Sequence, residues 1–557
     1  MSEKTNVDFR QLEQIRPDRP APKLPSKWSN LSAAVIHTAR RLKNSPAVAD
    51  SSGKKYSYIE TLTAAMALAQ TLERKLLDAE YVGVLMPPTV PTVVVNLALT
   101  LLGRVAVNLS YGDSVQRING CIKRCGIRQL ISSEAFLSKT GLQPDCETLK
   151  IEELSQQVTT GEKRIAYICA RYLPVIVLAG FFPGLRRELW ETATVIFTSG
   201  STGDPKGVVL SHSNILHNIM QIKEHGNLDE TAVVLGILPL FHSLGYTVTL
   251  WTILVLGYRA VYHTNPLEAK KIGELMQEHG VTVMACTPTL MRAFLKRCTK
   301  EQFATVKWLL LGSEKLKPEL ARDIQDKLGI EPVEGYGLTQ TSPVVAADVP
   351  MQVKTPDGRM VYGNKLGTVG QLVAGTAVAI VDVNSGKILP RGKGNEGVIY
   401  LAGPQVMQGY LGMPEETARV LQNGWFNTED IGWIDEDGFL HITDRLSRFA
   451  KVAGEMVPLG KLEETLRQVC QARDELVLAV TAIPDLQRGE RIAVVYTAEL
   501  GMSADEAVKR LQNTDTPRLW MPSARDFVLI EKMPVGSTGK LDLKEVKRLA
   551  AAALGSN

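Results

Sequence analysis

The sequence has few cysteines, and their spacing predicts neither a disulfide scaffold nor a zinc site. It holds seven cysteines in 557 residues, an odd number, and no CxxC pair. Disulfide-rich secreted domains and structural zinc sites both depend on closely spaced cysteines. The N-terminus is polar and carries acidic residues, unlike a secretory signal. These absences predict a protein of the reducing cytoplasm.

Long uncharged apolar runs and a strong excess of one charge are also missing. The nearest approach to a spanning helix is 172–185 (YLPVIVLAGFFPGL), which is shorter than the roughly 18 to 20 residues needed and is broken by proline and glycine. It predicts either a buried segment or one in a membrane interface, because Arg164, Arg171, Arg186 and Arg187 flank it. The net charge of +4 gives no reason to expect nucleic acid as a partner.

What is present indicates a large globular α/β protein. Apolar residues make up 45% and charged residues 22%, and the length allows two to four domains. Short apolar runs alternate with segments of helical spacing, which predicts parallel sheets covered by helices. The expected strands are 82–86, 128–132, 194–197, 281–286 and 308–311, and the expected helices include 96–102 and 318–328.

The pattern changes after about residue 370. Glycine-bounded segments at 397–402 and 438–443 predict short strands, and a smaller α+β unit follows from about residue 445. Its strands are expected at 476–482, 492–498 and 526–531, with a helix opened by a capping box of Ser503 and Glu506. The proposed domains are a loose, proline-rich arm (1–30), a large domain (31–444) and a small C-terminal domain (445–557).

The strongest chemical signal is TVIFTSGSTGDPKG, residues 194–207. A short strand leads into a loop of hydroxyl and glycine residues, followed by Lys206. Glycines let the backbone approach a ligand, hydroxyl and N–H groups can surround phosphate oxygens, and the lysine adds positive charge. A polar surface turn explains only one or two of these residues. The loop consists of Thr198, Ser199, Gly200, Ser201, Thr202 and Gly203.

This segment resembles the phosphate loop of the acyl-adenylate-forming enzymes, the superfamily of acyl-CoA synthetases, luciferases and peptide-synthetase adenylation domains. Further motifs follow in that family's order, and the resemblance extends from about residue 30 to 550. They are GYGLT (335–339), GPQVMQGY (403–410) with PEET (414–417), WFNTEDIGWIDEDG (425–438), the hinge region 445–463 and PVGSTGK (534–540).

A closer resemblance is to the synthetase part of bacterial acyl-acyl-carrier-protein synthetases and to long-chain fatty acid ligases. It rests on GRVAVNLSYG (103–112), CIKRCGIRQLISSEAFL (121–137) and LGSEKLKPEL (311–320), which leads to EGYGLTQTSPVV (334–345). The acyltransferase that often accompanies such synthetases carries HxxxxD. No histidine of this chain has an aspartate five residues later, so we expect that activity to be absent.

The resemblance implies a large AMP-binding domain with a β-barrel-like subdomain and a small mobile α+β domain. It implies an enzyme that joins a fatty acid to AMP, using ATP and Mg²⁺, and then transfers the acyl group to the phosphopantetheine thiol of acyl carrier protein or CoA. A cytoplasmic location, with membrane association as an option, fits these partners. A catalytically impaired binding scaffold, and an adenylating enzyme with a non-thiol acceptor, stay open as alternatives.

The resemblance also assigns roles to residues. Lys540, Thr339 and Arg445 are the catalytic candidates, and His242 is the candidate for the acyl site. Asp430 would bind the ribose hydroxyls, while Thr198 and Gln340 would face the metal. The remaining nucleotide or thiol-arm contacts are expected from Lys206, Gly312, Ser313, Glu314, Glu334, Gly335, Tyr336, Gly337, Lys451 and Gly454, together with the phosphate loop.

Several positions depart from the family pattern. Gln340 stands where an acid usually helps to hold Mg²⁺, and an amide offers a carbonyl oxygen but no charge. Glu429 replaces a glycine beside the expected ribose site, and Ser447 replaces a lysine before the hinge residue Arg448. Residues 352–365 form an insertion. These departures leave open reduced use of ATP or a changed metal requirement.

Overall fold

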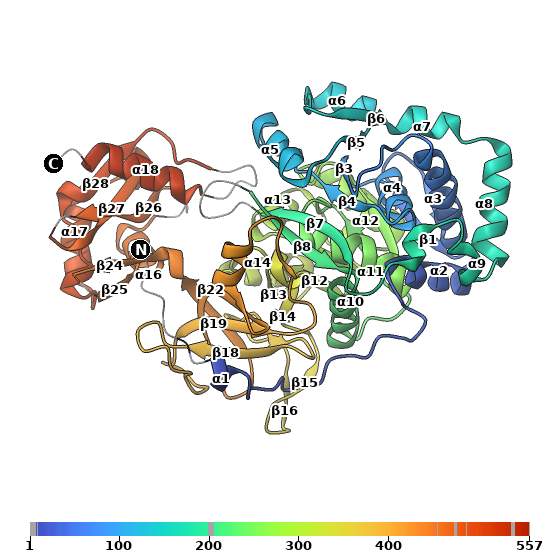
Figure 1. Cartoon of the computed structure of the whole chain (residues 1–557). Helices are drawn as coiled ribbons and strands as arrows, with labels where there is room; N and C mark the ends of the chain where they lie inside the picture. Colours follow the sequence, from blue (N-terminus) through green and yellow to red (C-terminus); the bar gives the residue numbers. More distant parts are fainter. Residues whose placement is uncertain are drawn as a thin grey trace. The chain divides into compact units, whose positions relative to one another are not determined.

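The chain forms two compact units (Figure 1). The computed structural model describes residues 7, 9–198, 205–453, 455–472, 476–485, 487–535 and 541–555, without the side chain of Ser447. Unit 1 comprises 1–395, 400–428 and 433–441, and unit 2 comprises 396–399, 429–432 and 442–557. The domain limits drawn from the motifs stay a prediction.

A nine-stranded sheet is the larger of two sheets in the first part of unit 1. Its order is β17–β14–β13–β12–β11–β9–β10–β1–β2, and the strands from β13 to β1 are parallel. The strands are β1 (Pro46–Asp50), β2 (Lys55–Ser57), β9 (Val233–Gly236), β10 (Arg259–Tyr262), β11 (Val283–Cys286), β12 (Trp308–Leu311), β13 (Val333–Gly337), β14 (Val344–Ala347) and β17 (Gln371–Leu372).

The second sheet of this part has seven strands in the order β20–β8–β7–β4–β3–β5–β6. Its β7 and β8 are antiparallel and lie on either side of the predicted phosphate loop. The strands are β3 (Tyr81–Leu85), β4 (Val105–Asn108), β5 (Gln129–Ser132), β6 (Glu147–Lys150), β7 (Thr192–Thr198), β8 (Lys206–Ser211) and β20 (Gly409–Tyr410).

Alternate residues of these strands enter different hydrophobic cores, as side chains on a pleated strand must. On β9, Val234 lies in one core while Val233 and Leu235 lie in another. On β7, Ile196 and Val195 are divided in the same way. Both faces of each strand are therefore covered, which explains why these runs are apolar throughout and not alternating.

Helices provide that cover (Figure 1). The expected helix at 96–102 begins earlier, at Val90, because Thr89 caps it and Pro91 fits its first turn. The helices of unit 1 are α1 (Phe9–Leu12), α2 (Leu31–Leu42), α3 (Tyr58–Glu73), α4 (Val90–Leu101), α5 (Val115–Cys125), α6 (Glu134–Thr140), α7 (Ile151–Gln157), α8 (Thr160–Tyr172), α9 (Val175–Leu178), α10 (His212–Gly226), α11 (Thr252–Leu256), α12 (Ala269–His279), α13 (Pro288–Arg297), α14 (Pro318–Leu328) and α15 (Pro414–Val420).

The later part of the chain forms a five-stranded sheet and a separate hairpin. The sheet has the order β18–β19–β22–β21, with β23 beside β22. The insertion predicted at 352–365 contains the hairpin of β15 (Gln352–Lys354) and β16 (Met360–Tyr362), whose turn holds Gly358 at φ +93°. The five strands are β18 (Ala377–Val381), β19 (Gly397–Ala402), β21 (Leu421–Gln422), β22 (Trp425–Ile434) and β23 (Leu440–Arg445).

Unit 2 is a sheet with helices on both faces. The sheet order is β25–β24–β27–β26, with β28 parallel to β27. Leu478 and Val480 of β26 pack in one core and Ala479 in another, so this strand too is buried on both sides. The elements are β24 (Phe449–Val452), β25 (Glu455–Pro458), β26 (Leu478–Asp485), β27 (Gly489–Thr497), β28 (Phe527–Ile530), α16 (Leu459–Cys470), α17 (Ala504–Gln512) and α18 (Leu543–Leu554).

The mixed α/β fold with a large and a small unit is therefore as predicted, and the expected strands all occur. The described part of the proposed N-terminal arm makes ordered contacts: Leu12 is fully buried, and Arg19 donates to the carbonyl oxygen of Leu372 at 2.6 Å. One local expectation was wrong. Ser503 does cap α17, but Glu506 pairs with Arg510 at 3.0 Å instead of completing a capping box.

The described helices include none that is long and apolar enough to cross a membrane.

Candidate active site

Two of the predicted motifs meet at the ends of neighbouring strands. β12 and β13 are parallel and in register, with Leu311 opposite Glu334. Gly312 to Glu314 follow β12 directly, while Glu334 to Gly337 form the carboxyl end of β13. In open α/β sheets, ligands bind beyond the carboxyl ends of the strands. The sheet thus brings together two segments that lie some twenty residues apart in the sequence.

Two glycines lie at this edge, Gly312 after β12 and Gly337 at the end of β13. A Cβ atom on Gly337 would lie 2.1 Å from the carbonyl oxygen of Pro343, so no other residue fits there. A Cβ on Gly312 would point toward the carbonyl oxygen of Gly335 at 3.6 Å. Gly337 is therefore required by the close approach of the Pro343 carbonyl, and Gly312 lies beside the backbone of Gly335 at the neighbouring strand end.

Glu334 is a buried carboxyl at the same edge. Its Oε1 accepts a hydrogen bond from the backbone N–H of Leu316 at 3.2 Å. Burial raises the pKa of Glu334 to about 7, since the charged form loses its hydration. The Glu314 carboxylate points elsewhere: its Oε2 accepts a hydrogen bond from the hydroxyl of Thr289, in the first turn of α13, at 2.8 Å.

Lys206 lies at the start of β8, opposite Thr198 of β7. Its Nζ is almost wholly buried and lies 2.6 Å from Oε2 of Glu416, a residue of α15. The same ammonium group lies over the ring of Tyr410, 5.2 Å from its centre. The ion pair lowers the pKa of Glu416. Lys206 therefore has a fixed position beside the described start of the predicted phosphate loop.

Gln340 contacts the same tyrosine. Its Nε2 donates to the hydroxyl of Tyr410 at 3.1 Å, and its backbone oxygen accepts from the N–H of Met407 at 2.8 Å. Lys206 and Gln340 thus both contact Tyr410, although one comes from a strand and the other from a short helical turn. Since the amide nitrogen faces Tyr410, Oε1 is the atom that Gln340 can offer to a cation.

Thr339 and the predicted acyl-site residue are also close in space. Ser243 Oγ donates to Thr339 Oγ1 at 3.4 Å, which brings the segment PLFHSLG against the GYGLT motif. His242 is exposed, and its ring lies against Phe241 with centroids 4.6 Å apart. It is not a core histidine. By contrast, Trp251 and Leu254, which follow this segment in the sequence, are fully buried in the main core.

The predicted ribose and hinge residues form their own contact in unit 2. Arg445 Nε lies 2.9 Å from Oδ1 of Asp430. Asp430 is buried, whereas 66% of the Arg445 side chain is exposed. The pair combines a fixed carboxylate with a cation that solvent or a ligand can reach.

Other predicted residues of unit 2 are described only in part. Lys451 is exposed on β24, and its backbone N–H donates to Glu490 at 2.8 Å. Arg448, assigned to the hinge, donates to the buried carboxylate of Glu463 at 2.7 Å. Some predicted site residues of both units lie outside the described residues. They are Ser199, Gly200, Ser201, Thr202, Gly203, Gly454 and Lys540.

Carboxylate, histidine and cysteine side chains do not gather into a metal site in the part of the chain that the structure describes. The donors predicted for Mg²⁺ are the Thr198 hydroxyl and the Gln340 amide oxygen, both uncharged. Mg²⁺ keeps several waters and takes much of its coordination from substrate phosphates in nucleotide sites. This donor set fits an ion that arrives with a nucleotide.

Comparison with known proteins identifies the family. A model described as AMP-binding enzyme matches residues 35–411, which is more than half of the chain. The chain belongs to the AMP-binding enzyme family. The resemblance to acyl-adenylate-forming enzymes is thereby confirmed.

Relatives of this family match nearly the full length. The chain is 27% identical to a long-chain-fatty-acid–CoA ligase of Bacillus subtilis, over 93% of this chain and 94% of that one. It is 23% identical to the corresponding ligase of Salmonella typhimurium, over 96% and 97%. Among solved structures, ATP-bound MatB from Rhodopseudomonas palustris superposes with a TM-score of 0.75 at 24% identity, over 93% of this chain and 98% of that one.

Sequence reasoning missed three residues of the site. Tyr410 and Glu416 lie within the motifs GPQVMQGY and PEET, which marked the region without giving either residue a role. Ser243 follows His242 in PLFHSLG and had no signal of its own. Glu429 shows why its position usually holds glycine: its φ is +60°, a conformation that costs a residue with a Cβ roughly 1 kcal/mol or more.

Proposed function

We propose that this enzyme is an AMP-forming acid–thiol ligase that activates a fatty acid. Its carboxylate attacks the α-phosphorus of ATP, pyrophosphate leaves, and an acyl-adenylate forms. A thiol then attacks the acyl carbon, losing its proton, and AMP leaves. The convergence of Gly312–Glu314 with Glu334–Gly337 at neighbouring strand ends, in a chain of the AMP-binding family, carries the proposal.

The residues of unit 1 would bind and orient the nucleotide. Lys206, held by Glu416 and Tyr410, supplies a fixed positive charge near the phosphate loop. Thr339, with Ser243 behind it, supplies a hydroxyl for the α-phosphate. Such fixed groups stabilise developing charge without having to reorganise. Mg²⁺, when bound, would neutralise phosphate charge beside Thr198 and Gln340.

The residues of unit 2 would hold the ribose and complete the charge balance. The buried carboxylate of Asp430 can accept hydrogen bonds from both ribose hydroxyls, and its ion pair with Arg445 orients it. Lys540 is proposed to bridge the acyl carboxylate and the α-phosphate. Lys451 and Gly454 are proposed to contact the pantetheine arm during the second step.

CoA is the acceptor we favour, and acyl carrier protein is the alternative. Both present the same phosphopantetheine thiol, so the chemistry of transfer is identical. The full-length similarity to two long-chain-fatty-acid–CoA ligases supports a long-chain acid and CoA. Parallel assays with CoA and with holo-acyl carrier protein, read by mass spectrometry of the thioester, decide between them.

The first test is ATP–pyrophosphate exchange by the full-length protein with acetate, octanoate, palmitate and an aryl acid. We expect exchange that depends on the fatty acids and rises with chain length. Exchange with the aryl acid alone would reassign the substrate. Silence with every acid, from folded protein, would contradict adenylation.

Lys540→Ala tests the proposed role of the PVGSTGK motif (534–540). Loss of the bridging charge should lower acid-dependent exchange roughly 10²- to 10³-fold, by comparison with other charge-stabilising groups. Circular dichroism and the unfolding temperature should not change. Exchange at the wild-type rate would remove Lys540 from its proposed role.

A second candidate function is a binding scaffold with little turnover. It is favoured by Gln340, whose amide nitrogen is engaged by Tyr410 and whose oxygen carries no charge. Calorimetry that detects acyl-chain or nucleotide binding without exchange at any Mg²⁺ concentration would support it. Gln340→Glu would then show whether a restored acid is enough to regain turnover.

A further inference from the structure

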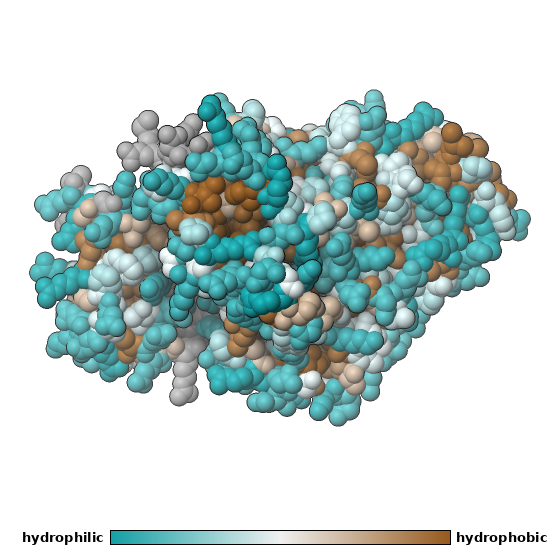
Figure 2. Space-filling model, turned by 90° about the horizontal axis from the view of Figure 1, so that it is seen from below, coloured by the Kyte–Doolittle hydropathy of each residue, from teal (hydrophilic) through white to brown (hydrophobic). Residues whose placement is uncertain are grey.

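An exposed apolar face lies on α8, α9 and the turn that follows. Ile165, Ile168 and Tyr172 recur at spacings of three and four along α8, and all three are exposed. Ile176 of α9 is 84% exposed and Phe181 is 59% exposed. Figure 2 shows brown side chains gathered at the right-hand end, where Figure 1 places α8 and α9. We call these five residues the α8–α9 face.

The apolar segment 172–185 is therefore divided between the core and the surface. Leu178, Phe182 and Leu185 are buried, while Ile176 and Phe181 point outward. The sequence predicted that this segment is either buried or lies in a membrane interface. Burial accounts for one half of it, and the exposure of the other half needs another explanation. Isolated exposed isoleucines are ordinary, but a continuous group with a buried anchor marks an interaction site.

The face stands on a rigid base. Arg40 of α2 donates to the carbonyl oxygens of Ala170 at 2.8 Å and Cys169 at 3.0 Å, which fixes the last turn of α8. A Cβ on Gly184 would lie 1.9 Å from the carbonyl oxygen of Thr100, so the turn after α9 is pressed against the end of α4. The backbone that carries the exposed side chains is thus held in place, and it is not a loosely packed loop that could fold inward.

Basic side chains accompany the face. Lys163, Arg164 and Arg186 form no ion pair with a carboxylate of the described chain, and Arg186 donates only to the carbonyl oxygen of Ala179, at 2.8 Å. Arg171 donates to the hydroxyl of Tyr172 and lies over its ring at 5.7 Å. Apolar and aromatic side chains flanked by Lys and Arg are typical of segments that lie in a lipid headgroup region.

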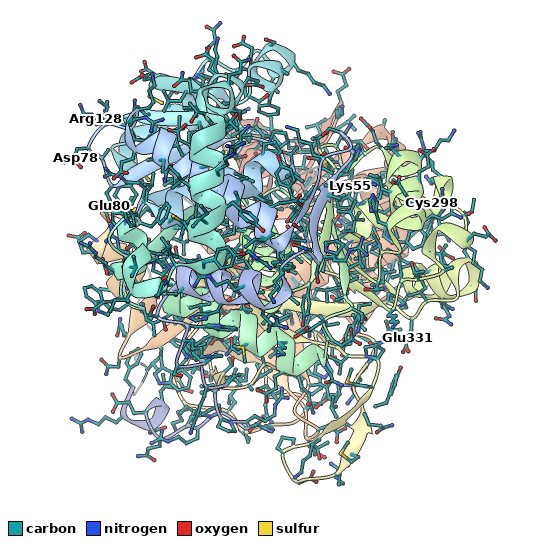
Figure 3. The ribbon with its side chains drawn as sticks, turned by 90° about the vertical axis from the view of Figure 1, so that its right-hand side faces the viewer. Lys55, Asp78, Glu80, Arg128, Cys298 and Glu331 are labelled. Carbon is teal, nitrogen blue, oxygen red and sulfur yellow. The ribbon has the colours of Figure 1, made fainter. Side chains whose placement is uncertain are left out.

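Two carboxylates on this side, those of Glu162 and Glu191, are paired with arginines. Glu162, in the first turn of α8, is bound by Arg74 at 2.8 Å. In Figure 3, which faces α8, Asp78 and Glu80 lie at the left edge of the view. The turn after α9 also borders an open hollow of about 450 Å³ lined by Arg104, Arg186, Arg187 and Glu191, where Arg187 pairs with Glu191 and Arg104 lies 3.4 Å from Asp78.

We propose that the α8–α9 face docks on the surface of an anionic phospholipid bilayer. Ile165, Ile168, Ile176 and Phe181 would enter the boundary between headgroups and acyl chains, with Tyr172 at headgroup level. Lys163, Arg164, Arg171 and Arg186 would contact lipid phosphates. The charge of this rim favours an anionic membrane over a second copy of the face, because two copies would oppose like charges.

The test is sedimentation of the full-length protein with vesicles of phosphatidylcholine alone or mixed with phosphatidylglycerol. We expect binding to the mixed vesicles at low salt, weakened at high salt because the attraction is screened. The double variant Ile176→Gln, Phe181→Gln should bind the mixed vesicles at least roughly tenfold more weakly than wild type, because it removes two apolar anchors. Each of Arg164→Gln and Arg186→Gln should reduce the partition roughly fivefold.

Matched controls replace similar side chains elsewhere. Leu267→Gln removes an exposed leucine, 70% exposed, outside the face, and Arg322→Gln removes an exposed arginine of α14; both should bind like wild type. ATP–pyrophosphate exchange with octanoate in detergent-free buffer should be equal in all variants, so loss of docking and loss of catalysis are distinguishable. The replaced side chains are exposed, and unfolding temperatures should stay constant.

Three results would overturn the proposal. The first is wild-type protein that stays in the supernatant with mixed vesicles at low salt. The second is equal loss of binding in the control variants. The third is a concentration-dependent dimer, seen by analytical ultracentrifugation, that Ile176→Gln abolishes, because the face would then join two copies of the chain.

Discussion

Lys206 is held by two side chains from distant parts of the sequence, Glu416 and Tyr410. Removing one partner of a buried ion pair leaves an uncompensated charge, which costs about 3 to 5 kcal/mol when both groups are buried. Glu416 is one-third exposed, so solvent screens the effect. We expect Glu416→Gln to lower the free energy of unfolding by about 1 to 2 kcal/mol and to slow ATP–pyrophosphate exchange. Urea unfolding and exchange kinetics measure the two effects.

The adjacent residue provides the control for this substitution. Glu415 is exposed on the same turn of α15, so Glu415→Gln should change neither stability nor exchange. If both variants had the same stability and exchange rate, the contact between Glu416 and Lys206 would contribute to neither.

Glu334 predicts a pH dependence of stability. Its pKa is raised by burial from 4.5 to about 7, so the folded chain binds the proton more tightly than the unfolded chain. Stability from this group is fully present below about pH 4.5 and is lost as the pH rises to about 7. Between about pH 4.5 and pH 8, the free energy of unfolding of wild type should therefore fall by up to about 3 kcal/mol relative to that of Glu334→Gln.

Urea unfolding of both proteins at several pH values measures this difference. Asp348, whose pKa is raised to about 8 mainly by burial and in part by the charge of Glu334, titrates in both proteins. The difference between the proteins therefore reports Glu334 together with its coupling to Asp348. A constant difference across the range would mean that Glu334 is solvated and titrates normally.

At the scale of single elements, the start of α17 provides a sharp comparison. The Ser503 hydroxyl accepts from the N–H of Glu506 at 3.2 Å, whereas the Glu506 side chain reaches forward to Arg510. Ser503→Ala should cost about 1 kcal/mol, the usual value of an N-cap. Glu506→Ala should cost only about 0.3 to 0.5 kcal/mol, since it loses an exposed pair four residues apart.

Thermal or urea unfolding of the two variants tests the comparison. Equal losses would indicate a complete capping box in solution. The element shows the limit of a short motif: Ser503 and Glu506 have the right spacing, but Arg510 competes for the same carboxylate.

The segment 172–185 shows a similar limit at the scale of an element. Its composition is apolar throughout, so hydropathy cannot separate Leu178, which is buried, from Ile176, which is exposed. The difference arises from the direction in which a short helix and a turn are fixed by their neighbours. The packing of Gly184 against α4, and the bonds of Arg40 to the end of α8, hold these elements in place.

At the scale of the whole molecule, the two units have separate hydrophobic cores. Leu466 of α16 is fully buried within unit 2, and Leu97 of α4 is fully buried within unit 1. A buried Leu→Ala substitution costs about 2 to 5 kcal/mol. Leu466→Ala should lower the unfolding temperature of one calorimetric transition, and Leu97→Ala should lower that of the other. A single transition shifted equally by both would show that the units unfold together.

Much of the fold was predictable because its signals are local. The apolar runs of β11 and β12 and the helical spacing of α14 need no knowledge of the rest of the chain. The order of the motifs was enough to predict the family and the nucleotide segments. Tyr410 and Glu416 were not assigned, because nothing in their spacing reveals that they surround Lys206.

The sequence by itself determined the fold class, the alternation of strands and helices and the family of this protein, since periodicity and ordered motifs are properties of neighbouring residues. Which distant residues meet could be seen only once the chain was folded. Folding placed Gly312 beside Gly335 and gathered Lys206 and Gln340 around Tyr410. It also turned half of an apolar segment toward solvent. These outcomes depend on how sheets and helices pack, and packing is set by contacts between residues that lie far apart in the chain.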